Sequence, residues 1–421
     1  MKKITLAILL LISFKGFAQN TCILLSADRV FDGEKMIVDG EVLIKGSKIM
    51  QVGIDITPPQ GCLEFNYGNA TIMPGMIEGH AHLLLHPYNE TSWNEQVLNE
   101  SVAERAIRGA IHAEKTLQAG FITVRDLGSE GAGYADIGLK QAIEKGIIEG
   151  PRLIVAGPAI VATGSYGPKG FKEQVQVPLG AHVADGHDDL IKEVRRQIGG
   201  GADFIKVYAD YRWGPEEEAQ PTFTLEELKL IVDITESSGR KVAAHAATAE
   251  GMRRATMAGV ITIEHGDGGT DEVFQMMKEK GVALCPTIAA GDAISQYRGW
   301  NKEKDPDPER IIQKKKSMKL AIKSGVTIAA GGDVGVFPHG DNVRELEMMV
   351  EYGMTPLAVL QSVTTVNAKV FGIDHLVGRI VPGLEADIVV VDGNPVQNIA
   401  KLRDVKTVIK SGKIIKGTND K

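Results

Sequence analysis

Cysteine is scarce in this chain, with three residues among 421. Cys22, Cys62 and Cys285 are too few and too widely spaced for a disulfide scaffold or for a cysteine-based zinc site. Whether Cys22 and Cys62 pair is left open by the sequence. Cysteine therefore does not supply the chemistry of this protein.

An excess of positive charge is also lacking, because 47 Lys and Arg residues stand against 54 Asp and Glu residues, a formal net charge of −7. Nucleic acids select basic surfaces, so no nucleic-acid partner is expected. With 43% hydrophobic residues the chain is an ordinary globular protein, long enough for a large domain and a smaller one. These features favour a small-molecule substrate and leave homo-oligomerisation open.

Long apolar runs are absent after the first 18 residues. Lys2 and Lys3 precede an apolar run over residues 4–14, and Gly16 and Ala18 place small residues at the −3 and −1 positions of a cleavage site. The run is shorter than the roughly 20 residues of a membrane-spanning helix. A signal peptide over residues 1–18 is therefore favoured over a membrane anchor. We expect a periplasmic or secreted protein with no membrane attachment after cleavage.

Short alternations of apolar and polar residues occupy both ends of the chain, residues 19–72 and 380–421, and are typical of β-strands. Between them, strand-like runs alternate with helix-like runs, which indicates successive βα units. Eight strand-like runs end on a polar or small residue, at His82, Asp126, Gly157, Asp210, Ala246, Gly266, Thr287 and Asp333. Eight is the number that a closed barrel needs. An open doubly wound sheet is the alternative, but no glycine fingerprint follows the first strand. We predict an α/β fold, a (β/α)8 TIM-type barrel with β-rich ends.

Histidines and charged residues gather at the ends of these predicted strands. They are His80, His82, Lys206, His245, His265 and Asp333. His80 and His82 lie two residues apart, so strand alternation directs both side chains to one face. One such pair could equally be core packing. Barrel enzymes, however, build their sites from the C-terminal ends of different strands, and imidazoles with a carboxylate suit divalent metals such as zinc.

Lys206 is unusual because it lies inside the apolar run Phe204-Ile205-Lys206-Val207. A lysine in such a strand must lose its charge or find a partner. Taken with the four histidines and Asp333, it predicts a metal site at the mouth of the barrel.

These residues lie in motifs that resemble the amidohydrolase superfamily over nearly the whole mature chain. The motifs are residues 73–82 (MPGMIEGHAH), 204–207 (FIKV), 244–246 (AHA), 262–266 (TIEHG), 332–333 (GD) and 381–387 (VPGLEAD). The resemblance implies that residues 19–72 and 380–421 close into one small composite β domain beside a barrel of residues 73–379.

The resemblance also implies a cofactor of two divalent metal ions, with zinc the first candidate. His80, His82 and Asp333 would hold the more buried ion, and His245 and His265 the second. Lys206 would bridge both ions as a carbamate, which a buried lysine with a depressed pKa can form with carbon dioxide. Asp333 would act as the catalytic residue that accepts a proton from water and delivers it to the leaving amine.

Within the superfamily the chain resembles the branch of Xaa-Pro dipeptidases and imidazolonepropionase-like proteins, whose enzymes remove C-terminal residues from dipeptides or N-acyl amino acids. Residues 337–342 (FPHGDN) support this branch. Two segments depart from it. Residues 163–166 (TGSY) stand where many members have Thr-Gly-Gly-His, and residues 210–213 (DYRW) stand where they have a Gly-Gly turn. Both departures lie on the substrate side.

Four residues near these segments are candidate substrate contacts, namely Tyr166, Tyr211, Arg212 and His339. Arg212 can pair with a substrate carboxylate in the bidentate way that arginine favours, or it can be a solvated charge. Five further residues lie beside the expected ligands, and either orient the histidines or form internal salt bridges. They are Glu78, Arg125, Asp126, Glu264 and Asp267.

We expect an exported binuclear hydrolase that cleaves an amide bond in a dipeptide or N-acyl amino acid by metal-activated water. One alternative is hydrolysis of a cyclic amide, a lactone or a deaminase substrate in the same barrel. The presence of Lys206 disfavours this alternative, because deaminases and true imidazolonepropionases of the superfamily typically hold one metal and lack the bridging lysine. A degenerate barrel that only binds a metal or ligand would have lost ligands, and all six are present.

Overall fold

The structure is a computed structural model that describes residues 22–172 and 174–417. The expected signal peptide over residues 1–18 lies outside the described residues. Among the described residues, no helix has the length and apolar character needed to cross a membrane.

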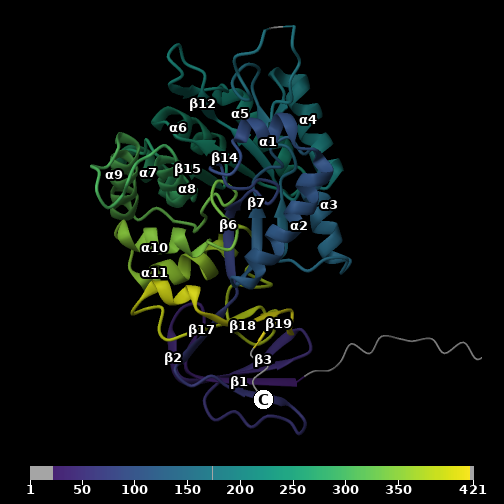
Figure 1. The fold of residues 1–421 in the computed structure, drawn as a ribbon, viewed down its shortest axis with the longest axis vertical. Coiled ribbons are helices and arrows are strands. Elements are labelled where there is room, and N and C mark those ends of the chain that lie inside the picture. Colours follow the sequence, from purple (N-terminus) through teal and green to yellow (C-terminus); the bar gives the residue numbers. More distant parts are fainter. Residues whose placement is uncertain (1–21, 173, 418–421) are drawn as a thin grey trace, which may run out of the picture.

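One mixed sheet is built from both ends of the chain. Its strands are β1 (Cys22–Phe31), β2 (Met36–Lys45), β3 (Lys48–Gly53), β4 (Leu63–Asn66), β5 (Ala70–Pro74), β17 (Ile388–Asp392), β18 (Val405–Lys410) and β19 (Lys413–Lys416). They follow the order β19-β18-β17-β5-β1-β2-β3, and β4 pairs with β1. Buried alternate residues such as Leu25, Ile72 and Ile388 form a hydrophobic cluster on it. The purple and yellow strands therefore lie together at the foot of Figure 1, whereas the exact domain boundaries stay a prediction.

A disulfide answers the question that the sequence left open. Cys22 at the start of β1 is bonded to Cys62 just before β4, across a sequence separation of 40. Cys285 is free and buried. The bond joins two neighbouring segments of the same sheet.

Parallel strands make up the centre of the larger part of the molecule. They are β6 (Met76–Ala81), β7 (Phe121–Asp126) and β8 (Arg152–Val155) in one sheet, and β9 (Ile160–Val161), β10 (His182–Val183), β11 (Ile205–Tyr208), β14 (Val242–Ala246), β15 (Thr262–His265) and β16 (Ala283–Cys285) in another. A short antiparallel hairpin, β12 (Asp210–Arg212) and β13 (Ala219–Pro221), follows β11. The fold is thus α/β with mixed sheets.

Backbone hydrogen bonds connect the two parallel sheets on both sides. The amide of Asp203 donates to Val155 at the end of β8 over 2.8 Å. On the other side, residues 327–334 form bridges from Leu284 to Ile328 and from Ala81 to Val334. All eight predicted strand runs therefore correspond to a strand or to this bridging segment.

Helices connect and cover the parallel strands (Figure 1). They are α1 (Trp93–Asn99), α2 (Val102–Gln118), α3 (Ala135–Glu144), α4 (Gly186–Gly200), α5 (Leu225–Glu236), α6 (Ala249–Ala258), α7 (Asp271–Lys280), α8 (Ile288–Tyr297), α9 (Glu309–Ser324), α10 (Val343–Glu351), α11 (Pro356–Gln361) and α12 (Asn367–Val370). The helix start expected at Thr224 is confirmed, since its side chain accepts from the Glu227 amide while the Glu227 carboxylate accepts from the Thr224 amide.

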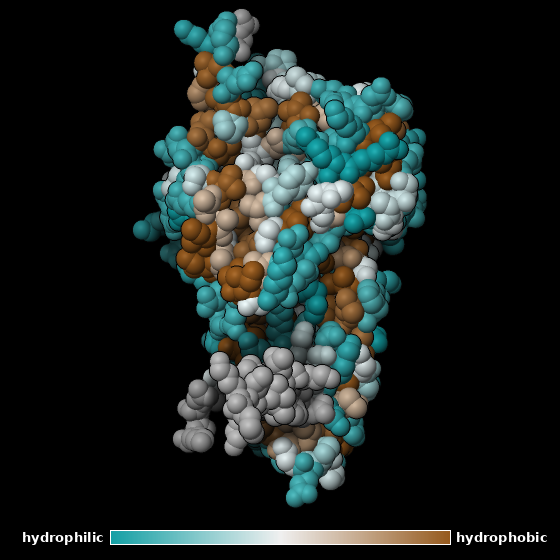
Figure 2. Space-filling model, turned by 90° about the vertical axis from the view of Figure 1, so that its right-hand side faces the viewer, coloured by the Kyte–Doolittle hydropathy of each residue, from teal (hydrophilic) through white to brown (hydrophobic). Residues whose placement is uncertain are grey.

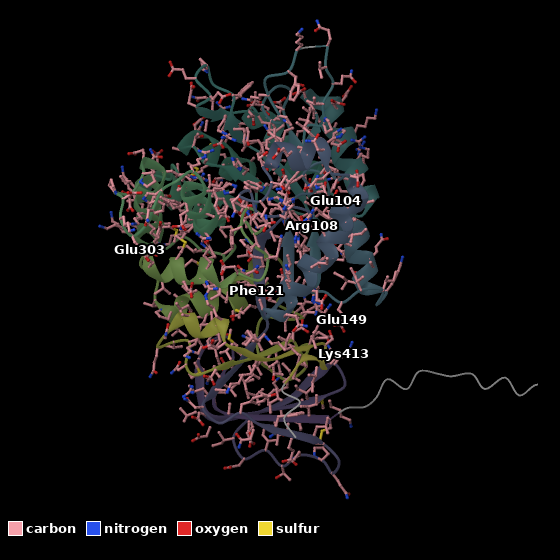
Figure 3. The ribbon with its side chains drawn as sticks, viewed as in Figure 1. Glu104, Arg108, Phe121, Glu149, Glu303 and Lys413 are labelled. Atoms are coloured by element: carbon pink, nitrogen blue, oxygen red, sulfur yellow. A yellow bond between two sulfur atoms is a disulfide. The ribbon has the colours of Figure 1, made fainter. Side chains whose placement is uncertain are left out.

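The core is continuous from the strands to the helices. Phe121, at the start of β7, is 1% exposed and belongs to the main hydrophobic cluster. Figure 2 shows that hydrophobic side chains on the outer face occur in small groups among hydrophilic ones. An ion pair between Glu149 and Lys413, with a nitrogen to oxygen distance of 3.0 Å, helps to join the mixed sheet to the larger part (Figure 3).

Candidate metal centre

The six predicted ligands come together at the C-terminal ends of the parallel strands. His80 Nε2 and His82 Nε2 lie 3.6 Å and 3.4 Å from Asp333 Oδ1. His80, His265 and Asp333 each offer a ligand atom within 4.8 Å of the others. The ring centroids of His245 and His265 are 4.5 Å apart.

Lys206 lies on β11 among these groups. Its side chain is 1% exposed, and its Nζ is 5.4 Å from the centroid of the Tyr208 ring. Burial lowers the pKa of Lys206, although the Glu264 and Asp333 carboxylates oppose this effect. The strand thus presents a buried lysine whose pKa lies below its usual value.

The histidines are prepared to act as neutral ligands. Burial lowers the pKa of His80 to about 4, and it lowers the pKa values of His245 and His265 well below their usual range. His82 Nδ1 lies 2.9 Å from the Gly128 carbonyl oxygen and His265 Nδ1 lies 2.7 Å from Thr287 Oγ1. Engaging Nδ1 in this way leaves Nε2 free for a metal, so the donor set fits a divalent ion.

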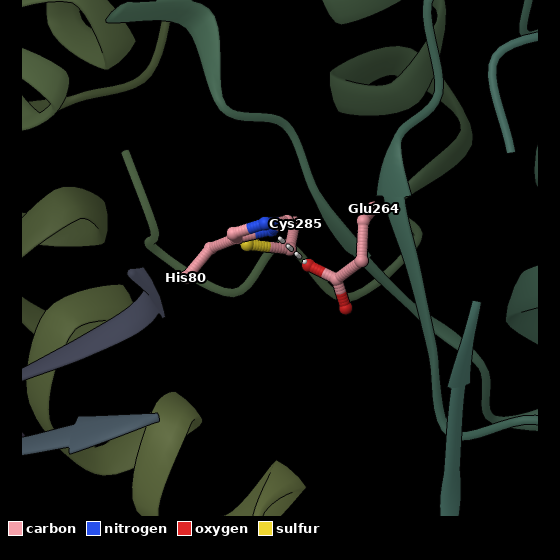
Figure 4. Close-up of side chains that lie close together, drawn as sticks. All are labelled: His80, Glu264 and Cys285. Atoms are coloured by element: carbon pink, nitrogen blue, oxygen red, sulfur yellow. Dashed lines mark hydrogen bonds and ion pairs between the residues drawn. The ribbon is translucent and has the colours of Figure 1, made fainter. Parts of the chain in front are cut away.

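A buried chain of charges holds His80. Its Nδ1 is 2.9 Å from Glu264 Oε2, and Glu264 Oε1 accepts from Arg125 Nη2 over 2.7 Å. Burial alone would raise the pKa of Glu264, but Arg125 and the His80 hydrogen bond outweigh it and hold the pKa below its usual range. Figure 4 shows Glu264 pointing to His80, with the Cys285 thiol beside them. Arg125 and Glu264 thus form an internal salt bridge, and Glu264 also holds the ring of the predicted ligand His80, so the two sequence interpretations apply together.

We expect Arg125→Met to destabilise the protein by about 3–5 kcal/mol, because Glu264 would remain buried without its partner. Arg125 also donates to the Gly79 carbonyl and to Thr262 Oγ1, so several buried acceptors would lose a donor. Denaturant unfolding measures the change in the free energy of unfolding.

The matched control is Arg108→Met, which removes a surface pair with Glu104 at 2.9 Å on α2 (Figure 3). Exposed pairs contribute about 0–1 kcal/mol. Equal losses from the two variants would show that Arg125 is not a buried structural charge.

The remaining predicted neighbours of the ligands shape the loops. Glu78 accepts from the amides of His80 and Gly332, and burial raises its pKa to about 7. Asp126 accepts from the Leu83 amide over 2.9 Å, directly after the first histidine pair. Asp267 forms an ion pair with Lys314.

Strained backbone marks the same strand ends. His265, Thr287 and Asp333 have positive φ angles of 73°, 47° and 60°. Residues other than glycine rarely adopt this conformation, and it concentrates at functional sites. Two of these residues, His265 and Asp333, are predicted ligands. Their positions at the site therefore carry the conformational free-energy cost of a positive φ angle.

A cavity of about 940 Å³ opens above the ligands. It is lined by His80, His82, His245, His265 and Asp333, and also by Tyr166, Tyr211 and Arg212. Three of the four predicted substrate contacts thus face the site.

His339 requires a correction, because it does not line this cavity. Its Nε2 donates to the Leu85 carbonyl over 3.1 Å, and its ring stacks on His112 with centroids 4.2 Å apart. It borders a separate hollow against α2. Its contacts support the loop after β6 rather than a substrate.

Glu130, Trp93 and Tyr208 are among the cavity residues that the sequence did not single out. Glu130 is 3% exposed, and its carboxylate accepts from Trp93 Nε1 and Tyr166 Oη over 2.8 Å and 2.7 Å. Tyr208 Oη lies 3.4 Å from the other carboxylate oxygen. The glycines that flank Glu130 at positions 128 and 131 are the only local signal of an unusual loop.

The α/β scaffold thus gathers four imidazoles, a carboxylate and a lysine beneath a cavity, a donor set that fits a metal-dependent enzyme. The chain belongs to the amidohydrolase family, whose model matches residues 71–415. The predicted superfamily and the predicted action on amide bonds are confirmed by this match and by the relatives that follow.

Ochratoxinase of Aspergillus niger is 31% identical over 374 residues, which cover 82% of this chain and 76% of that protein. Imidazolonepropionase of Geobacillus kaustophilus is 24% identical over 383 residues, which cover 82% and 81%. Among solved structures, a Xaa-Pro dipeptidase with bound methionine superposes with a TM-score of 0.84 at 31% identity, over 94% of this chain and all of that one.

Proposed function

We propose that this protein is an exported, binuclear metal-dependent hydrolase that cleaves the amide bond of a dipeptide or N-acyl amino acid. The observation that carries the proposal is the gathering of His80, His82, His265 and Asp333 under one cavity, with Lys206 buried among them. The similarity to a Xaa-Pro dipeptidase and to ochratoxinase supports an amide substrate with an amino-acid part.

The proposed scaffold is a closed (β/α)8 barrel. Its support is the parallel pairing of β6, β7 and β8, of β11, β14, β15 and β16, and the bonds of residues 327–334 to both sheets. In such a barrel the active site lies at the C-terminal ends of the strands, where the histidines are.

Two divalent ions, preferably zinc, would be held by the four histidines, Asp333 and a carbamate on Lys206. Bound ions supply an activated water and polarise the scissile carbonyl. Lys206 suits carbamate formation, because burial favours the neutral amine that reacts with carbon dioxide.

The side chains divide the remaining tasks. Asp333 Oδ1 would accept the proton of the attacking water and deliver it to the leaving amine, since it lies between two histidines and is reachable from the cavity. Arg212, together with Arg298 and Arg310 on the same cavity, would bind the carboxylate of the leaving amino acid.

We expect two zinc ions per chain when the protein is purified with zinc in excess, because the donor groups exceed what one tetrahedral ion uses. Elemental analysis after removal of loosely bound metal measures the ratio. One ion at saturation would favour the mononuclear alternative, a deaminase-like or cyclic-amide hydrolase.

We expect the mature protein outside the cytoplasm to begin at Gln19. The disulfide between Cys22 and Cys62 supports export, because such bonds persist in oxidising compartments. N-terminal sequencing of the secreted or periplasmic form tests this, and a form that still begins at Met1 would contradict it.

The experiment that tests the function is a hydrolysis screen of the zinc-loaded protein against dipeptides, N-acyl amino acids, cyclic amides and lactones. Turnover of the first two classes supports the proposal. Turnover of cyclic amides or lactones alone would support the enzymatic alternative, and no turnover in any class would support a binding protein.

A further inference from the structure

One wall of the cavity combines a buried carboxylate with aromatic rings. Trp93 at the start of α1, Tyr166 after β9, Tyr208 at the end of β11 and Tyr211 in β12 all line the cavity with Glu130. We name these five residues the aromatic wall. The Tyr166 ring lies 5.3 Å from Trp93, 4.6 Å from Tyr208 and 4.7 Å from Tyr211, measured between centroids.

Glu130 organises this wall. Its carboxylate accepts from Trp93 and Tyr166 and lies within hydrogen-bond distance of Tyr208, so three ring systems from separate segments share one acceptor. Glu130 itself has a positive φ of 49°, a conformation that costs free energy in a residue other than glycine. The carboxylate is therefore held in place from both its backbone and its side chain.

The wall is electron-rich. Burial and the charge of Glu130 raise the pKa of Tyr166 well above its usual range, so its phenol stays neutral. A phenol that donates to a carboxylate is polarised toward its ring, and ring faces attract cations. One ring of the wall already has a cation beside it, because the Arg212 guanidinium lies 5.2 Å from the centroid of the Tyr211 ring.

We propose that the aromatic wall is a subsite for a cationic amino group, the α-ammonium of a dipeptide, and that it makes the enzyme prefer dipeptides to N-acyl amino acids. This inference rests on the proposed amide hydrolysis and narrows its substrate class. The ammonium would lie against the rings and the Glu130 carboxylate, while the carboxylate at the other end of the dipeptide would meet Arg298 and Arg310, which line the same cavity from the end of α8 and the start of α9. A neutral acyl group gains neither the ring nor the carboxylate attraction.

The test compares alanylmethionine with propionylmethionine, which differ only in that an ammonium replaces a hydrogen. We expect the wild-type zinc-loaded enzyme to favour alanylmethionine by roughly tenfold or more in kcat/KM, the scale of a desolvated cation–π contact. Glu130→Gln keeps the shape and removes the charge, so this preference should fall toward unity, mainly through a higher KM for alanylmethionine. Glu303→Gln changes an exposed carboxylate that does not line the cavity (Figure 3), so it should keep the preference.

A second pair of variants covers the case in which Glu130→Gln does not fold. Tyr211 is partly buried, and its hydroxyl accepts from Arg212 over 3.1 Å. Tyr211→Leu removes a ring and should lower the preference severalfold, while Tyr211→Phe keeps the ring and should retain most of it. A purely structural wall would change both substrates equally in every variant.

Direct binding separates this inference from the proposed function. Tetramethylammonium and tert-butyl alcohol are similar in size and differ in charge, and calorimetry with the zinc-loaded protein compares them. If tetramethylammonium binds preferentially and Glu130→Gln abolishes this preference, the aromatic wall is a cation subsite. This conclusion would stand even if no dipeptide were hydrolysed and the proposed function failed. Hydrolysis of both methionine derivatives at equal kcat/KM, or equal binding of the two probes, overturns the wall whatever the reaction is.

Discussion

Asp333→Asn is expected to lower kcat by roughly 10²–10⁴-fold, the range of general acid–base catalysis, while the protein keeps most of its metal. Asparagine has nearly the same shape and still offers an oxygen to an ion. Its amide, however, cannot accept the proton of the attacking water. Asp333 is the one carboxylate whose oxygen lies within 4 Å of both His80 Nε2 and His82 Nε2 among the described residues.

Steady-state kinetics with elemental analysis of the same preparation checks this prediction. Asp188→Asn is the matched control, because Asp188 is fully exposed at the start of α4 and should change neither value. An Asp333→Asn enzyme with normal kcat would remove Asp333 from proton transfer. Loss of both ions would show instead that the carboxylate serves mainly as a ligand.

The position of the site was predictable because its signals are local. Strand alternation places His80 and His82 on one face. A lysine or histidine inside an apolar run can be recognised from the sequence alone, without knowledge of its contacts. The structure places His80 and His82 at the end of β6 and Lys206 inside β11, as expected from the sequence. Strand alternation and apolar periodicity thus predict the α/β class and the positions of the candidate ligands, whereas the bound metal stays a prediction.

Glu130 was not predictable in the same way, because its role depends on partners far along the chain. Trp93 and Tyr166 lie 37 and 36 residues away from it in sequence, and Tyr208 lies 78 away. It sits in a loop with no periodicity, where an exposed glutamate would be the ordinary expectation. The pairing of Cys22 with Cys62 was unpredictable for the same reason, because it depends on β4 lying beside β1 in the folded sheet.

His339 shows the opposite error, in which a motif suggested function and the packing shows support. It follows the last bridging segment, as several catalytic loops do in barrels. Its ring is instead committed to His112 and to the Leu85 carbonyl, and His112 in turn donates to the Leu83 carbonyl. Both histidines therefore fix the loop that follows His82, which is a structural contribution to the site.

Lys206→Ala should have the largest effect on the metal centre. Removing a bridging carbamate deletes the anionic ligand shared by the two proposed ions, so we expect fewer than two ions per chain and a turnover reduced by several orders of magnitude. The fold should persist, because the position is surrounded by buried strand residues such as Ile205 and Val207. Elemental analysis, kinetics and thermal unfolding measure the three expectations separately.

Rescue distinguishes a bridging carbamate from a structural amine. A short carboxylic acid can enter the gap left by Lys206→Ala and span two ions as the carbamate would, so added acetate or propionate should restore part of the occupancy and of the turnover. Lys206→Arg keeps a positive charge but forms no carbamate, and it should stay inactive with or without the acid. Asp333→Asn should not respond to the acid either, because its defect lies in proton transfer. If Lys206→Ala instead retains two ions and near-normal turnover, the lysine bridges nothing, and the ions must be held by the histidines and Asp333 alone.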